Sequence, residues 1–146
     1  MMLYQDTITK LSEFYPLNSV EDKNSVSSAW FIPENSNLPL TLTWGEKDEH
    51  GLTLTIALGR LALNADKKVL LELMTINMMM AAVQGPRFSY SQSTDMITLM
   101  SSVPQELLKE ENIYHIKEII DNLISKSEQT RLHMENEGVK LCSELE

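Results

Sequence analysis

The spacing of hydrophobic residues along the chain changes several times, and each change indicates a new element of secondary structure. Residues 2–15 carry apolar side chains at helical intervals and end before Pro16, which predicts an amphipathic helix. Apolar and polar residues then alternate over 38–44 and again over 52–58, which is the period of half-buried strands. The short charged turn 45–51 between them predicts an antiparallel hairpin.

Shorter apolar runs predict three further strands and a last helix. Residues 29–32 form a strand after a polar loop over 17–28, and residues 87–90 and 96–100 form two strands around a turn. Pro104 opens the last helix, because proline is tolerated in the first helical turn. The apolar face of this helix consists of Leu107, Ile113, Ile116, Ile119, Ile120, Leu123 and Ile124.

The helical pattern decays after about Ser127 into a stretch rich in charged residues. The sequence therefore predicts one domain over residues 1–130 and a charged C-terminal tail over residues 131–146. Within the domain the order is helix, three strands, helix, two strands, helix, or α-β-β-β-α-β-β-α. We expect an α+β fold in which a five-stranded antiparallel sheet is covered on one side by three helices.

The central segment, residues 65–84, constrains this arrangement most strongly. It contains no Gly or Pro and is followed by Gly85 and Pro86, so it predicts a helix with a marked end. When the residues are placed at about 100° intervals, one apolar face contains Val69, Leu73, Ile76, Met80 and Val83. The opposite apolar face consists of Leu70, Leu71, Met74, Met78, Ala81 and Ala82.

A helix with two apolar faces must be buried on both sides or cross a membrane. Crossing is not expected, because Lys67, Glu72 and Asn77 interrupt the apolar run. One face can cover the sheet, but a chain of 146 residues offers little for the other face to contact. We therefore expect a homodimer with the second face, from Leu70 to Ala82, as its interface. The alternative is a helix buried inside a monomer.

Composition adds a constraint on partners. The chain has a formal net charge of −9, which argues against nucleic acid or anionic lipid as its main partner. The N-terminus has an early Asp6 and no apolar run after a basic start, so no secretory signal is predicted. Cys142 is the single cysteine and cannot form an internal disulfide, which fits a reducing cytoplasm.

The search for catalytic chemistry yields little. The five glycines begin no phosphate-binding loop, and no Cys and His set has the spacing of a zinc site. His115 and Glu118 lie three residues apart on the last helix and are the candidate pair for a metal site. A metal needs three or four converging ligands. We therefore expect no metal, no other cofactor and no enzymatic activity.

The motifs from Leu58 to Leu123 resemble those of class I type III secretion chaperones, the group that includes the Tir chaperone. The first helix and the early strands agree with this family in placement rather than in residues. The methionines at 78–80 and the loop 34–39 with its prolines depart from the family pattern. The resemblance rests on the order of Leu58, Gly59, Leu70, Leu73, Asn77, Gly85, Pro86, Phe88, Ile97, Leu99, Pro104, Ile116, Ile120 and Leu123.

This resemblance implies a homodimer in the bacterial cytoplasm that forms largely through the central helix. It also implies a task, which is to hold the N-terminal region of secreted effector proteins in an extended, secretion-competent state without ATP. Binding uses apolar pockets and strand addition to an exposed sheet edge. Docking to the secretion-associated ATPase is left open. The expected effector contacts are Leu3, Ile8, Leu11, Trp30, Ile32, Phe88 and Tyr90.

Two other functions are compatible with the sequence. A dimeric regulatory or scaffold protein binds a folded partner, and only the state of the bound partner separates it from a chaperone. A small metal-dependent enzyme uses His115 with Glu118, and a measurement of metal content separates it from both.

Overall fold

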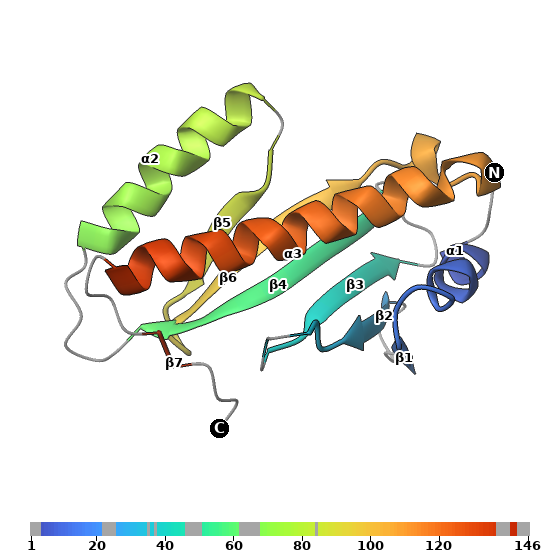
Figure 1. Cartoon of the computed structure of the whole chain (residues 1–146), viewed down its shortest axis with the longest axis horizontal. Coiled ribbons are helices and arrows are strands. Elements are labelled where there is room, and N and C mark those ends of the chain that lie inside the picture. Colours follow the sequence, from blue (N-terminus) through green and yellow to red (C-terminus); the bar gives the residue numbers. More distant parts are fainter. Residues whose placement is uncertain are drawn as a thin grey trace.

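The alternating segments of the sequence form strands and the segments with helical spacing form helices, as Figure 1 shows for the computed structural model. The structure describes residues 4–21, 26–34, 36, 38–45, 51–61, 68–83, 85–136 and 141–142. The helices are α1 (Tyr4–Leu11), α2 (Lys68–Ala82) and α3 (Ile113–Asn136), with the 3-10 turns η1 (Gln105–Leu107) and η2 (Glu110–Asn112) before α3. The strands are β1 (Asn18–Glu21), β2 (Val26–Phe31), β3 (Leu40–Gly45), β4 (Leu52–Leu61), β5 (Arg87–Ser91), β6 (Met96–Val103) and β7 (Leu141–Cys142).

The strands form one antiparallel sheet in the order β1-β2-β3-β4-β6-β5, and β7 pairs with the end of β4. The predicted α+β class and antiparallel sheet are confirmed, but the described residues form a sheet of seven strands instead of five. β1 lies in the segment predicted to be a loop, and β7 lies in the segment predicted to be a tail. β1 has the sequence Asn-Ser-Val-Glu, which shows no apolar alternation, so the pattern did not predict a strand. The strand forms through backbone pairing of Asn18–Glu21 with β2.

The last helix also differs from its prediction at both ends. Pro104 is followed by the two 3-10 turns, so α3 begins only at Ile113. It then continues to Asn136 instead of ending near Ser127. Ser127 and Met134 are both buried, which shows that the polar-looking part of α3 still packs on the protein. A helix with few apolar residues can therefore continue when some of its side chains pack on the rest of the protein, because tertiary packing supplies most of the stability of a helix.

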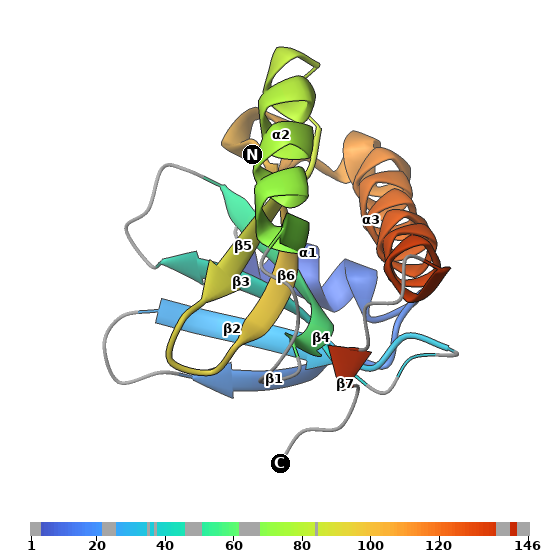
Figure 2. The same cartoon turned by 90° about the vertical axis from the view of Figure 1, so that its left-hand side faces the viewer.

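One face of the sheet carries the core. Along β3 and β4 every Leu, Ile and Trp side chain is buried, and the threonines between them, like Ala57, are half-buried on the opposite face. α3 runs along the core face against β4 and β6, and α1 packs on α3 at one end (Figures 1 and 2). α3 contributes Ile116, Ile120 and Leu123, none more than 1% exposed, and each such burial contributes about 1.5–3 kcal/mol.

α2 takes a different position from the other two helices. It packs on β5 at one end of the sheet and projects away from α3 (Figure 2). Leu73, 5% exposed, is its single buried residue, while Val69 and Ile76 are half-buried against the core. α2 therefore contacts its own chain along one side only and leaves the remaining surface open.

Candidate functional site

The outer side of α2 carries a continuous apolar surface. Leu71, Met74 and Met78 are 64%, 65% and 74% exposed, and Ala81 and Ala82 are also exposed. The structure thus brings five of the six predicted interface residues together on the free side of the helix, and the sixth, Leu70, is half-buried at its margin. We call these six residues the α2 stripe. Exposed apolar surfaces of this kind mark protein contacts.

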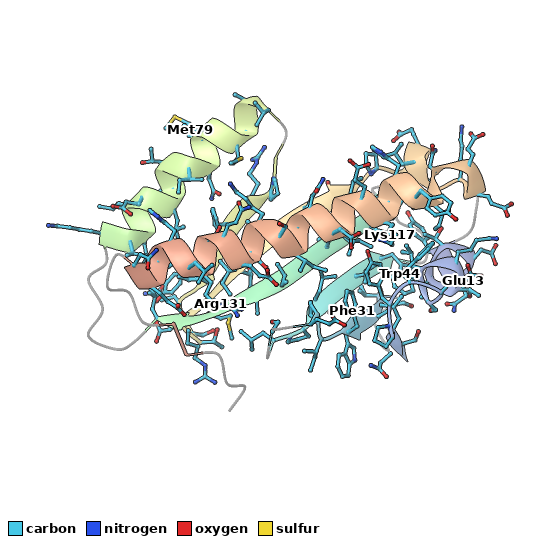
Figure 3. All side chains as sticks on the ribbon, in the orientation of Figure 1. Glu13, Phe31, Trp44, Met79, Lys117 and Arg131 are labelled. Carbon is cyan, nitrogen blue, oxygen red and sulfur yellow. The ribbon has the colours of Figure 1, made fainter. Side chains whose placement is uncertain are left out.

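Two further apolar residues of this region lie outside the stripe. Met79, 68% exposed, points into solvent from α2 (Figure 3). Val83 was predicted on the inner face with Leu73, and this prediction was wrong, because Val83 is 72% exposed. The helix ends at Ala82 and Val83 lies in the following turn, so helical spacing no longer decides where its side chain points.

A side-chain amide fixes α2 to the edge of the sheet. The Nδ2 group of Asn77 donates to the backbone oxygen of Phe88 at 2.9 Å, and the backbone N–H of Phe88 donates to Oδ1 of Asn77 at 2.6 Å. Phe88 lies on β5, the last strand of the sheet order, opposite Leu99 of β6. Its two backbone groups therefore face the outer edge, and Asn77 occupies both of them. The β5 edge is closed to another strand at this point.

The opposite edge of the sheet is open. β1 pairs with β2 alone, with Asn18 opposite Trp30, and no other described strand pairs with it. The side chains of Asn18 and Ser19 are exposed. In an antiparallel ladder, alternate residues of an edge strand direct both backbone groups outward. β1 consequently directs backbone donors and acceptors outward that no strand among the described residues uses, and an extended segment can bond to them.

The predicted effector contacts do not form one site in this structure. Ile8, Leu11 and Phe88 are 2%, 0% and 8% exposed, because the apolar stripe of a short helix and the inward side of a strand both fill the core. Tyr90 is half-buried and donates a hydrogen bond to Asp95. Leu3 lies outside the described residues. The accessible residues near β1 are Trp30, which is half-buried, and Ile32, which is 48% exposed.

A groove that the sequence did not reveal lies beside Ile32, between the end of α1, the end of β2 and α3. Its volume is about 460 Å³. It was missed because its residues come from three segments that are far apart in the sequence and show no common spacing. Its lining residues are Phe14, Tyr15, Pro16, Phe31, Ile32, Pro33, Glu34, Asp121, Ile124 and Glu128. We call it the β1-proximal groove.

Tyr15 organises the inner end of this groove. Its ring stacks on Phe31 with 4.7 Å between the centroids, and its hydroxyl donates to Oδ1 of Asp121 at 2.6 Å. The other carboxylate oxygen of Asp121 accepts a hydrogen bond from Lys117 at 2.6 Å. Burial, and after it the hydrogen bond to Asp121, raise the pKa of Tyr15 far above its usual range. Tyr15 therefore stays protonated and continues to donate to Asp121.

The candidate pair for metal chemistry is not supported by further ligands. His115 lines a larger groove of about 760 Å³ together with Arg87 and Ile119, while the exposed Glu118 does not line it. Among the residues that the structure describes, no three His, Cys, Asp or Glu side chains come close enough to hold a metal ion. None of the described helices combines the length and the hydrophobicity that crossing a bilayer requires.

Comparisons with known proteins agree with this architecture. The sequence model of the Tir chaperone protein (CesT) family matches residues 8–131. A comparison with curated protein sequences finds no match. A chain of the HopA1-SchA chaperone-effector complex has a TM-score of 0.65 at 16% identity, over 88% of this chain and 92% of that chain. A chain of the ExsC-ExsE complex has a TM-score of 0.67 at 16% identity, over 90% and 95%. At this identity the two structures show a shared fold.

The amide of Asn77 gives a testable prediction about α2. In Asn77→Leu the backbone N–H and oxygen of Phe88 lose their partners beside the packed helix, so we expect the free energy of unfolding to fall by about 1–3 kcal/mol. Urea denaturation at a fixed protein concentration measures the change. The matched control is Asn122→Leu, since Asn122 is exposed on α3, and its effect is expected to stay within about 0.5 kcal/mol. Equal effects of the two substitutions contradict the role given to Asn77.

Proposed function

The chain belongs to the Tir chaperone protein (CesT) family, and from this premise we propose that it keeps the N-terminal region of secreted effectors extended, in the bacterial cytoplasm and without ATP. Its general role is that of a type III secretion chaperone that binds effectors, and it is not an enzyme. His115 and Glu118 accordingly have no catalytic task in this account.

The observation that carries the proposal is the difference between the two sheet edges. The β5 edge is occupied at Phe88 by Asn77, while the outer edge of β1 is unpaired among the described strands. An extended effector segment adds to β1 as a further antiparallel or parallel strand. Backbone hydrogen bonds of this kind do not depend on side-chain identity, which allows one chaperone to hold different effectors. Because the bonds use the unfolded backbone itself, a segment in a compact fold cannot make them.

Side chains next to β1 add apolar contacts to this backbone pairing. Ile32 is accessible beside the groove, and Trp30 is half-buried on the sheet opposite Asn18. In our proposal these two residues contact the effector directly, while Ile8, Leu11 and Phe88 are core residues that shape the surface. Tyr90 lies on the closed edge strand, and the contact predicted for Leu3 stays a prediction.

We propose that the functional unit is a homodimer joined through the α2 stripe. Leu71, Met74 and Met78 each expose more than three fifths of their surface, an arrangement that is unfavourable in water unless another surface covers them. A second copy offers the same stripe, and two-fold symmetry lets one stripe cover the other. The small Ala81 and Ala82 let the two helices approach closely. The effector-loaded dimer is the species expected to meet the secretion-associated ATPase.

Hydrogen–deuterium exchange tests the edge used for binding. The measurement compares the chaperone alone with the chaperone bound to an N-terminal effector segment. We expect slower amide exchange in β1 on binding and unchanged exchange in β5, because the added strand pairs with β1 alone. Protection of β5 with no change in β1 contradicts the proposal. Binding of an effector region that is already compactly folded supports the regulatory or scaffold alternative instead.

The dimer is tested by charge substitution on α2. Met78→Glu or Met74→Glu places a carboxylate in the stripe, where it loses water without gaining a partner. We expect the dimer dissociation constant to rise about 100-fold, which corresponds to about 2.7 kcal/mol. Analytical ultracentrifugation over a concentration series measures it.

The matched control is Met79→Glu, which makes the same change at an exposed residue outside the stripe. It is expected to leave the dimer intact, and circular dichroism confirms that all three variants fold. If Met79→Glu separates the copies while Met78→Glu does not, the interface lies on another side of α2.

A further inference from the structure

The β1-proximal groove combines an aromatic floor with an acidic rim. Phe31 and Pro33 are buried at its base, and Tyr15 stacks on Phe31. Three carboxylates, those of Glu34, Asp121 and Glu128, line the same groove. Figure 3 labels Phe31 on β2 and Lys117 on α3, in the half of the molecule that also holds α1. Aromatic faces and carboxylates together suit a side chain that has an apolar stem and a positive end.

The groove already has one cation at its border. The Nζ atom of Lys117 lies 5.7 Å from the centroid of the Phe14 ring and 2.6 Å from Oδ2 of Asp121. Asp121 also accepts the hydroxyl hydrogen of Tyr15, so both of its oxygens are in use. This arrangement shows that an ammonium group is held here by an aromatic ring and a carboxylate at the same time.

The remaining two carboxylates of the rim are not used in this way. Glu34 and Glu128 are both exposed, and in the described part of the chain neither has an ion-pair partner. They line the same groove as Asp121, whose carboxylate is already paired with Lys117. The rim therefore carries more carboxylates than cations. A positive group that enters the groove can pair with Glu34 and Glu128 without breaking an existing ion pair.

The position of the groove relates it to the open sheet edge. Pro16 lies two positions before Asn18, the first residue of β1, and Phe31 follows Trp30, the partner of Asn18 on β2. The groove thus opens beside the start of β1, on the side of the sheet where Phe31 is buried. A strand added to β1 has alternate side chains on this side. One of them reaches the groove at the end of the added strand.

We propose that this groove binds a basic side chain, arginine in preference to lysine, of the extended segment that pairs with β1. The planar guanidinium group of arginine stacks on the aromatic floor and donates two parallel hydrogen bonds to one carboxylate. The ammonium group of lysine is not planar and does not form this paired arrangement. A neutral apolar side chain contacts the floor but leaves the rim unpaired, and an acidic one is repelled. This inference rests on the proposed function for the identity of the segment, and on the groove alone for its chemistry.

Capped tripeptides test the chemistry without an effector. The probes are acetyl-Val-Arg-Val-amide and the same peptide with norleucine or glutamate at the centre. NMR of the Ile32 and Ile124 methyl groups follows the titration, since both residues line the groove. We expect the arginine peptide to bind about tenfold more tightly than the norleucine peptide, and the glutamate peptide to cause no saturable shift. Added salt is expected to weaken the arginine peptide only.

A pair of double variants locates the effect. Glu34→Gln with Glu128→Gln keeps the shape of the rim but removes its unpaired charges, and we expect the preference for arginine to disappear. The control is Glu106→Gln with Glu118→Gln, which removes two exposed carboxylates outside this groove and is expected to retain the preference.

The outcomes separate this inference from the proposed function. Equal binding of the arginine and norleucine peptides, no binding of any peptide, or a preference that survives the Glu34 and Glu128 substitutions overturns the basic-side-chain site. An arginine preference that depends on Glu34 and Glu128 supports the site. If exchange in β1 then stays unchanged on effector binding, the site stands and the strand addition fails.

Discussion

The pair of hydrogen bonds between Asn77 and Phe88 is the constraint on which the surfaces of this protein depend. These bonds hold α2 against β5 with Leu73 turned inward, and this orientation places Met74 and Met78 on the free side of the helix. They also take the outward-facing backbone groups of Phe88, so the strand next to α2 cannot accept another strand there. One polar side chain thus orients the apolar stripe and blocks the β5 edge at Phe88.

The two ends of the sheet consequently differ in what they can bind. At the α2 end, the outward backbone groups of Phe88 are bonded to Asn77 and the free surface of the helix is apolar, which suits a partner with a complementary apolar face. At the β1 end, the outer backbone has no partner strand in the described part of the chain, and the neighbouring groove is acidic and aromatic, which suits an extended basic and apolar segment. In this account the division separates self-association from cargo binding, so that a dimer keeps its β1 edges free.

The sequence predicted the structure well where apolar residues recur at regular intervals and form a buried face. The alternation in β3 and β4 and the two faces of α2, except for Val83 at its end, were predictable, because burial imposes these periods on residues such as Leu73 and Leu54. β1 and the groove were not predictable, because β1 forms through backbone bonds and the groove joins residues from distant segments. Ile8 and Leu11 were predicted to contact the effector, but both are buried in the core. Helical spacing predicts an apolar face and does not distinguish a face that packs on its own core from one that binds a partner.

Whether two copies of the chaperone hold one extended effector can be measured by native mass spectrometry of the chaperone isolated with its effector, combined with limited proteolysis of the same complex. We expect two chaperone chains on one effector, with protease protection confined to the N-terminal region of that effector. A single chaperone chain on a fully folded and uniformly protected partner contradicts this expectation.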